Sequence, residues 1–335
     1  MKYGNIDFNG KTILITGGGG FIGSNLAFYF QNNYPKSRVI LFDIFRSLKK
    51  FENGNLQSFG HFDNLQGFSG EIFCGNINSD SDLSKLEEYH FDYIFHQAAI
   101  SDTRVYDQEM VFRTNLNSFY AIIQIAKRCN AKLIYASSAA TYGSLPSPQV
   151  IGVERPENPY AYSKFSMDRI ALSDKYSAQK IIGLRYFNVY GDREFYKNKT
   201  SSMVIQLAHQ ILKGERPKLF ENSRDIYRDF IYIEDIIQSN ILACEYDQNG
   251  VFNVGTGLAR SFQDIADILQ KELGTKYETQ YFPNPYSDYQ SFTQADISLT
   301  KKYLNFEPRY SLEKGVKSYI PYIIKMFDRN LDDQN

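Results

Sequence analysis

The chain has 335 residues, of which 43% are hydrophobic, 16% aromatic and 22% charged. This balance supports a large core and excludes wholesale disorder, and the net charge of −1 excludes an overall field that would attract nucleic acid or an anionic membrane. Cys74, Cys129 and Cys244 lie far apart in the chain, so we expect reduced core thiols and neither disulfides nor a metal site. The N-terminus does not resemble an export signal and no apolar run reaches about 18 residues, so we expect a soluble, cytoplasmic protein.

Short apolar runs alternate with stretches of helical periodicity through the first half of the chain. The predicted strands are residues 12–16, 39–43, 71–74, 93–95, 132–136 and 180–185. The predicted helices are residues 21–31, 105–128 and 160–176. Continuous apolar strands joined by helices are typical of parallel sheets, so the sequence predicts an α/β fold with a Rossmann-type doubly wound sheet. Glycines interrupt the pattern between Asp43 and Glu71, where we expect a long loop.

The second half of the chain mixes short strands and helices without a second glycine fingerprint. The predicted elements are a helix at 201–213, a strand at 229–232, a helix at 234–245, a strand at 251–254, a helix after Ser261 and a closing helix at 311–327. We expect residues 328–335 to form a frayed polar tail.

A glycine-rich turn, TGGGGFIGS at 16–24, follows the first predicted strand and opens the first predicted helix. We expect Gly17, Gly20 and Gly23 to bring main-chain N–H groups against a pyrophosphate at the start of that helix. The alternative is a glycine turn without a ligand. It is disfavoured because the second predicted strand ends in Asp43, an acidic residue suited to ribose hydroxyls, about 20 residues beyond the last glycine. The sequence therefore predicts a dinucleotide site.

Charge after the second strand bears on which dinucleotide binds. Asp43 favours NAD, whereas Arg46, Lys49 and Lys50 are able to pair with a 2′-phosphate or to form an ordinary solvated basic run. We favour NADP, with NAD as the alternative. Further cofactor contacts are expected after later strands and in the first helices; they are Phe21, Ile22, Asn76, Ile77, Gln97, Ala98, Ala99, Asn115 and Val189.

The positions of these motifs divide the chain into two expected domains. We expect residues 1–191 to form an NAD(P)-binding Rossmann domain to which residues 229–260 return. Residues 192–335 are then mainly a smaller α/β lobe that binds substrate.

A tyrosine and a lysine, Tyr160 and Lys164, are spaced to share one face of a helix. An ammonium beside a phenol is expected to lower the pKa of the phenol from about 10, so that Tyr160 acts as a base. Ser138, at the end of the fifth predicted strand, places a hydroxyl at the sheet edge where ligands bind in such folds. An amphipathic surface pair is the alternative for Tyr160 and Lys164, and Ser138 argues against it.

The glycine turn, Asp43, Ser138 and the Tyr160–Lys164 pair occur in an order that resembles the extended short-chain dehydrogenase/reductase family. Within it, several segments look like the members that act on an ADP-linked heptose: YASSAATYG at 135–143, RYFNVYG at 185–191, RE at 193–194, PKLF at 217–220, RDF at 228–230 and FTQAD at 292–296. The resemblance implies an NADP-dependent 6-epimerase for lipopolysaccharide core synthesis, which oxidises the heptose at C6 and reduces it again from the other face. It also implies a homo-oligomer associated through residues 105–128 and 160–176.

The same resemblance assigns roles to particular residues. Tyr160 is one base, Lys164 holds the nicotinamide ribose and tunes Tyr160, and Ser138 binds the reacting oxygen. Lys197 is the second acid/base, although a loop lysine is usually a solvated charge. The implied substrate contacts are Ser138, Asn188, Lys199, Gln206, Phe220, Glu221, Asn222, Ser223, Arg228 and Tyr289. Arg228 and Asp229 are alternatively an internal ion pair. Asp192, Lys199 and Gln206 depart from the family's pattern, which leaves the nucleotide and the sugar open.

Other functions remain as alternatives. The first is another nucleotide-sugar epimerase, or a reductase, of the same fold. A 4,6-dehydratase is disfavoured because Ala139 and Ala140 follow Ser138 where such enzymes place an acidic pair. The last is a non-catalytic NAD(P) sensor, which would have no need of Ser138, Tyr160 and Lys164.

Overall fold

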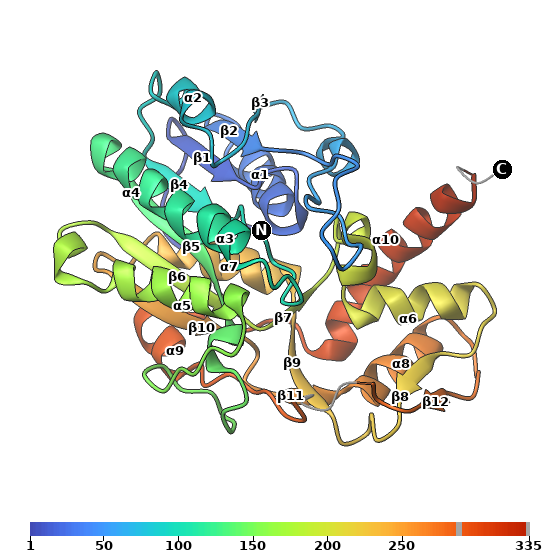
Figure 1. The fold of residues 1–335 in the computed structure, drawn as a ribbon. Helices are drawn as coiled ribbons and strands as arrows, with labels where there is room; N and C mark the ends of the chain where they lie inside the picture. The colour runs from blue at the N-terminus through green and yellow to red at the C-terminus, as the bar shows by residue number, and fades with distance from the viewer. Residues whose placement is uncertain (286–289, 333–335) are drawn as a thin grey trace.

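The computed structural model describes residues 1–285 and 290–332. Within these residues, seven parallel strands form one sheet in the order β10-β6-β5-β4-β1-β2-β3 (Figure 1). They are β1 (Thr12–Thr16), β2 (Arg38–Asp43), β3 (Glu71–Cys74), β4 (Tyr93–His96), β5 (Lys132–Ser138), β6 (Ile181–Tyr186) and β10 (Gly250–Val254). The predicted doubly wound sheet is confirmed, and the reversal of strand order between β1 and β4 makes the crevice where ligands bind in such sheets.

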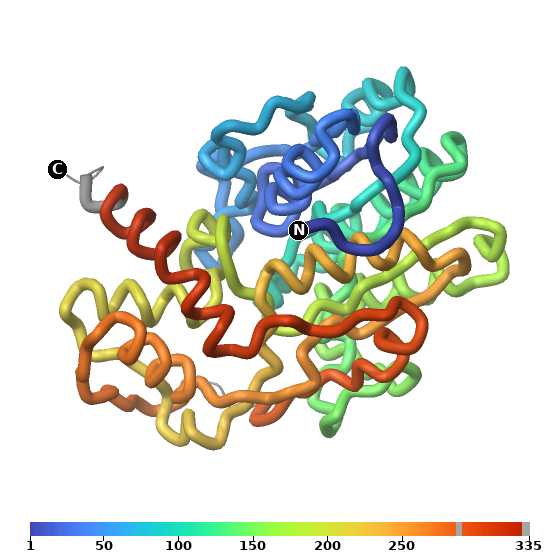
Figure 2. The backbone as a smooth tube through the Cα atoms, turned by 180° about the vertical axis from the view of Figure 1, so that it is seen from behind, coloured from blue at the N-terminus to red at the C-terminus, as the bar shows by residue number. Residues whose placement is uncertain are grey.

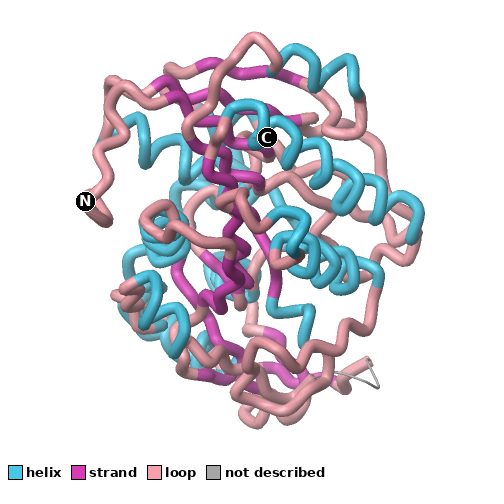
Figure 3. Tube along the Cα trace, turned by 90° about the vertical axis from the view of Figure 1, so that its left-hand side faces the viewer, coloured by secondary structure: helices cyan, strands magenta, loops and turns pink. Residues whose placement is uncertain are grey.

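Helices cover both faces of this sheet, as the side view in Figure 3 shows. The helices of the sheet region are α1 (Phe21–Asn33), α2 (Asp80–Leu83), α3 (Gln108–Phe112), α4 (Ser118–Cys129), α5 (Pro159–Ala171), α7 (Ile233–Ala243) and α9 (Ser298–Leu304). Side chains alternate along each strand, so that Ile13 and Ile15 of β1 pack in the core with α1 and α7, while Leu14 packs in the core with α4 and α5. This double burial explains why the inner strands of the sheet are mostly apolar, whereas the edge strand β3 is partly exposed.

A smaller lobe lies beside the carboxyl edge of the sheet (Figures 1 and 2). It contains α6 (Met203–Leu212), α8 (Phe262–Glu272) and α10 (Leu312–Asp332), together with strands β8 (Lys218–Phe220) and β12 (Gln280–Phe282), which pair in parallel. Strands β7 (Asn188–Tyr190), β9 (Tyr227–Tyr232) and β11 (Ala259–Ser261) form a further sheet between the two regions. The chain thus leaves the large sheet after β6 and returns to it at β10.

Some elements differ from the prediction. The single helix expected at 105–128 is two helices, α3 and α4, joined by a π-helical turn at Arg113–Asn117. The tail expected to fray from residue 328 is helical to Asp332, because α10 continues through it. Cys129 and Cys244 are buried, but Cys74 is exposed, so the expectation of core thiols is wrong for Cys74. The loop between β2 and β3 is confirmed and contains one short 3-10 turn, Phe62–Leu65.

Two broad properties follow from the described residues. None of their helices is long and apolar enough to cross a membrane. Their His, Cys, Asp and Glu side chains form no group of three or more that could hold a metal ion.

Candidate active site

A cavity of about 860 Å³ lies at the carboxyl ends of β1, β2, β4 and β5 and extends to the smaller lobe. Most of the residues singled out in the sequence line it: Gly17, Gly20, Phe21, Ile22, Gly23, Asp43, Asn76, Ile77, Gln97, Ala98, Ala99, Ser138, Tyr160, Lys164, Asn188, Val189, Lys197 and Arg228. The structure therefore brings together, in one cavity, residues at the carboxyl ends of β1 to β6 and residues of α5, β7, β9 and the loop after β7.

The glycine turn has no room for side chains at Gly17 and Gly23. Gly17 has φ +69°, and a Cβ there would stand 2.8 Å from the main-chain nitrogen of Ala98. A Cβ on Gly23, inside α1, would stand 2.2 Å from the carbonyl oxygen of Gly17. Helix α1 begins after Gly20 without a side-chain cap. Its first N–H groups consequently face the cavity end of the helix with the partial positive charge that suits a pyrophosphate.

Asp43 fixes this turn to the end of β2. Its carboxylate is buried and accepts hydrogen bonds from the N–H groups of Gly19, at 2.9 Å, and Phe45, at 2.7 Å. Burial raises the pKa of Asp43, although these main-chain donors act in the opposite direction. The carboxylate thus shapes the phosphate turn besides lining the cavity, a role that the sequence pattern did not indicate.

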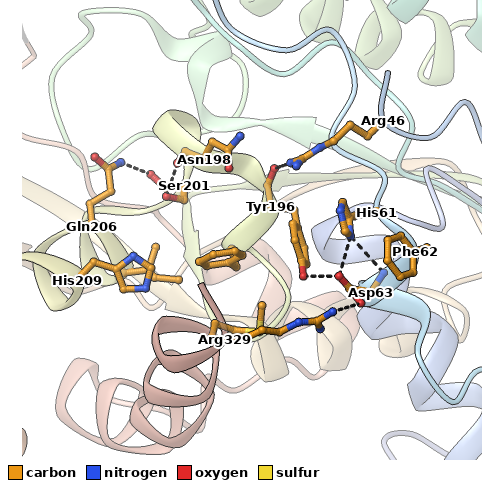
Figure 4. Close-up of a pocket in the computed structure, with 13 residues that line it drawn as sticks. Arg46, His61, Phe62, Asp63, Tyr196, Asn198, Ser201, Gln206, His209 and Arg329 are labelled. Atoms are coloured by element: carbon orange, nitrogen blue, oxygen red, sulfur yellow. Dashed lines mark hydrogen bonds and ion pairs between the residues drawn. The ribbon is translucent and has the colours of Figure 1, made fainter. Parts of the chain in front are cut away.

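The basic residues after β2 point in different directions. Lys49 lines the large cavity, whereas Lys50 and Arg46 do not. Arg46 instead donates to the carbonyl oxygen of Tyr196 and lines a second cavity of about 620 Å³ (Figure 4). Of the three residues expected near a 2′-phosphate, the structure therefore brings only Lys49 to the cavity that holds the glycine turn.

Ser138, Tyr160 and Lys164 meet where β5 ends against α5. Ser138 and Tyr160 are joined by a side-chain hydrogen bond, and the Ser138 Oγ also accepts the N–H of Ala140 at 3.1 Å. Lys164 Nζ donates to the carbonyl oxygen of Ala136 at 2.7 Å and lies 6.0 Å from the centre of the Tyr160 ring. Proline at the start of α5 and the cap by Asn158 fix where this helix begins, and hence where both side chains lie.

The electrostatics of this group differ from the expectation. Burial raises the pKa of Tyr160, only partly opposed by the Ser138 hydrogen bond, so the expected lowering by Lys164 is not found in this structure. Burial also lowers the pKa of Lys164 itself to about 8, although Asp168 acts in the opposite direction. The ammonium and the phenol are therefore both held where their charged forms are disfavoured.

Two buried residues, Asp168 and Arg185, support this group and were not singled out in the sequence. Arg185 Nε donates to Asp168 at 2.8 Å, and the same carboxylate accepts Tyr135 Oη at 2.7 Å and Ser137 Oγ at 2.9 Å. Ser137 precedes Ser138, and Asp168 lies one helical turn after Lys164. The signal for Asp168 was available, since it continues the four-residue spacing of Tyr160 and Lys164.

Asn115, expected at the cofactor, does not line the cavity. It lies in the π-helical turn and is fully buried. Its amide bonds both main-chain groups of Ile100, at 2.8 and 3.0 Å, and the hydroxyl of Ser163 at 3.0 Å. It thereby ties the loop after β4 to the helix that carries Tyr160 and Lys164.

Lys197 lies in the short helical segment Phe195–Thr200 and reaches the cavity from the side of the smaller lobe. Its Nζ lies 5.6 Å from the centre of the Phe21 ring. Burial lowers the pKa of Lys197, and Glu194 acts in the opposite direction. It is therefore not the solvated loop lysine that its sequence context alone would suggest.

At the substrate end of the cavity, Arg228 and Asn188 stand beside Phe230 and Phe262, two rings that the sequence did not single out. Arg228 donates to the carbonyl oxygens of Tyr227 and Gln290. The carboxylate of Asp229 has other partners: it accepts four hydrogen bonds at 2.6 to 3.1 Å, from Thr256, Gly257 and Ala295.

The other expected substrate contacts lie elsewhere. Gln206 lines the second cavity and donates to the carbonyl oxygen of Ser201 at 2.7 Å. Those that do not line the large cavity are Lys199, Gln206, Phe220, Glu221, Asn222 and Ser223. Tyr289 lies outside the described residues.

The lining residues fit a dinucleotide. At one end, the glycine turn and the start of α1 offer main-chain N–H groups and no bulk. At the other end, the hydroxyls of Ser138 and Tyr160 and the ammonium of Lys164 converge on the same cavity. This donor set suits a pyrophosphate flanked by a ribose and a reacting alcohol.

Comparison with known proteins agrees with this geometry. The model of the NAD dependent epimerase/dehydratase family matches residues 13–255. The chain is 34% identical over 323 residues to the ADP-L-glycero-D-manno-heptose-6-epimerase of Brachyspira hyodysenteriae, covering 93% of this chain and 98% of that protein.

Solved structures give the same result. The ADP-L-glycero-D-manno-heptose-6-epimerase of Helicobacter pylori is 48% identical with a TM-score of 0.89, covering 97% of this chain and 99% of that one. The UDP-glucuronic acid 4-epimerase of Bacillus cereus, solved with its sugar nucleotide and NAD, is 26% identical with a TM-score of 0.79, covering 94% and 99%. The chain belongs to the NAD dependent epimerase/dehydratase family.

Proposed function

We propose that this protein converts ADP-D-glycero-D-manno-heptose to ADP-L-glycero-D-manno-heptose, a step that serves lipopolysaccharide core synthesis. Two relatives that share 34% and 48% of its residues over nearly the whole chain bear the name of this epimerase. The observation that carries the proposal is that two groups able to move protons, Tyr160 and Lys197, reach one cavity from different segments of the chain. An inversion needs such a pair, because each epimer presents its hydroxyl differently.

A nicotinamide dinucleotide is the cofactor of this family, and we infer that here it is NADP. When bound, it would supply a reversible hydride acceptor for oxidation and re-reduction at C6 of the heptose, so that no net redox change would occur. The support for NADP is Lys49, which lines the cavity close in sequence to Asp43 and carries an ammonium able to pair with a 2′-phosphate.

The protein's own groups handle the protons. Tyr160 takes the proton of the C6 hydroxyl in one direction. Burial disfavours its phenolate, the hydrogen bond from Ser138 partly offsets this, and Ser138 also steadies the reacting oxygen. Lys197 takes the proton for the other epimer. Because burial lowers the pKa of Lys197, the neutral amine needed to accept a proton is accessible at a lower pH than for a solvated lysine. Lys164 holds the nicotinamide ribose.

Arg228 and Asn188 are the groups that we assign to the substrate. Arg228 is 8% exposed, and its guanidinium is suited to the diphosphate of a nucleotide sugar. We further propose a homo-oligomer that associates through α4 and α5, on which Tyr120 and Tyr162 are 40% and 50% exposed, and a cytoplasmic site of action, where nucleotide sugars are available.

The proposal is tested by incubating the purified protein with ADP-D-glycero-D-manno-heptose, without added cofactor, and following the configuration at C6 by proton NMR. Formation of the L-glycero epimer supports both the substrate and a retained dinucleotide. No reaction after NADP and NAD have been added refutes the heptose assignment. Turnover of another nucleotide sugar under the same conditions would instead identify a different epimerase of this fold.

A further inference from the structure

Tyr196, the residue before Lys197, is held more firmly than its place in a loop suggests. It is 8% exposed, and the His61 ring stacks on its ring with centroids 3.6 Å apart and planes 4° from parallel. The guanidinium of Arg46 lies 5.4 Å from the same ring and donates to the Tyr196 carbonyl oxygen. Tyr196 thus binds two residues of the long loop between β2 and β3.

Asp63, in that same loop, is the centre of the contacts (Figure 4). Its carboxylate accepts the Tyr196 hydroxyl at 2.7 Å and Arg329 of α10 at 2.9 Å, and His61 Nδ1 lies 3.4 Å away. Burial acts to raise the pKa of Asp63, but the hydrogen bonds from Tyr196 and Arg329 outweigh it and hold the pKa below its ordinary value. The carboxylate is therefore charged at neutral pH, and its hydrogen bonds are of the stronger, charge-assisted kind.

The segment around Lys197 needs such support. Arg193 has φ +72° and Asn198 has φ +51°, so a residue with unfavourable backbone geometry stands on each side of Lys197. One anchor lies within the segment, where the carboxylate of Glu194 accepts the N–H and the hydroxyl of Ser202, each at 2.7 Å. Tyr196 is the second anchor, and it is the one that faces away from the large cavity, toward the second cavity.

We propose that Tyr196, held by Asp63, is a positioning residue that keeps the Lys197 ammonium in the large cavity, and that Arg329 completes this clamp from the C-terminal helix. The clamp joins the cofactor-side loop, the Lys197 segment and α10, which are far apart in the sequence. This inference rests on the proposed function in one respect, since it takes Lys197 to act on the substrate.

The test uses two variants and two matched controls. Y196F removes the hydroxyl that Asp63 accepts, and R329Q removes the outer donor. Tyr3→Phe is the control for the first, because Tyr3 is 5% exposed and donates to Glu234 at 3.1 Å, far from this segment in the sequence. Arg216→Gln is the control for the second, because Arg216 is an exposed arginine paired with Glu278 at 3.0 Å.

In the full-length holoenzyme, Y196F should lower kcat about tenfold and R329Q about threefold. KM and the bound dinucleotide should stay close to wild type, the melting temperature should fall no further in Y196F than in Tyr3→Phe, and both controls should keep kcat within about twofold. Unchanged kcat in Y196F, or an equal loss in Tyr3→Phe, would overturn the inference while leaving the proposed function intact, provided that the wild type is active.

Amide hydrogen exchange gives a readout that needs no substrate. The peptide covering 195–200 should exchange at least about threefold faster in Y196F than in the wild type, with no such change in Tyr3→Phe. Equal protection in Y196F and the wild type would refute the clamp even if the heptose were not the substrate.

Discussion

Replacing Lys164 by methionine removes a charge that the fold buries, and it should stabilise the protein at neutral pH while abolishing turnover. Lys164 is 2% exposed. Burial lowers its pKa from 10.5 to about 8, which at 1.36 kcal/mol per pH unit corresponds to about 3 kcal/mol against folding below pH 8. The methionine variant also loses the 2.7 Å hydrogen bond that Lys164 donates to the Ala136 carbonyl oxygen, and this loss offsets about 1–3 kcal/mol of the stabilisation. The net gain is about 0–2 kcal/mol.

The pH dependence has a definite sign. Between pH 8 and 10.5 the unfolded chain holds more protons than the folded one, because the folded pKa of Lys164 is the lower. Wild-type stability therefore rises across this window, and the variant lacks the rise. Its advantage should be complete at pH 7, shrink above pH 8 and reverse by about pH 9.5.

The assay is urea unfolding of nucleotide-free protein at pH 7 and pH 9.5, since a bound dinucleotide would stabilise the two proteins unequally. Lys180→Met is the control, because Lys180 is 52% exposed and should change stability by less than about 1 kcal/mol at either pH. A K164M variant that is less stable than the wild type at pH 7, or a difference that does not shrink with pH, would refute the reasoning.

Three further substitutions test individual parts of the site. Tyr160→Phe should lower turnover about 10²- to 10⁴-fold with the dinucleotide still bound; a sensor would be unaffected, and the NMR assay distinguishes the two. Gly17→Ala should abolish dinucleotide binding in calorimetry, because its Cβ would stand 2.8 Å from the Ala98 nitrogen at φ +69°. Full affinity in this variant would contradict the role of the glycine turn as the pyrophosphate site. Lys49→Gln should weaken NADP about tenfold and NAD less than about twofold, whereas Arg46→Gln should not discriminate between them. Equal loss of both cofactors in Lys49→Gln would remove the support for NADP.

The pattern of apolar residues along the chain was sufficient to predict the strands of the large sheet. The predicted strands at β1 and β3 coincide with the observed ones residue for residue. Strand β1 is buried on both faces and apolar, whereas β3, at the edge of the sheet, exposes Ile72 and Cys74. The three-residue strands β7, β8, β11 and β12 were missed, since their pairing depends on distant partners and three residues show no periodicity. The π-helical turn at Arg113–Asn117 was also missed, because it leaves the helical periodicity of the sequence almost unchanged.

Within the site, the sequence identified which residues take part better than it identified where their side chains lie. Spacing on one helix put Tyr160 and Lys164 on a shared face, as found, but it could not show that burial would govern both pKa values. Arg46 and Lys49 are three residues apart in a loop. Because a loop has no regular periodicity, the sequence could not predict that Arg46 lines the second cavity and Lys49 the large one. The contacts of Tyr196 with Asp63 span the chain and leave no local signal.

The central claim is that C6 is inverted by a hydride that leaves the sugar and returns to it. The most direct measurement is the epimerisation of ADP-D-glycero-D-manno-heptose carrying deuterium at C6, in ordinary water, with the product examined by NMR and the dinucleotide by absorbance. The account predicts an L-glycero product that retains deuterium at C6 and no net accumulation of reduced dinucleotide. A product with hydrogen from water at C6, or reduced dinucleotide formed in step with product, would contradict it.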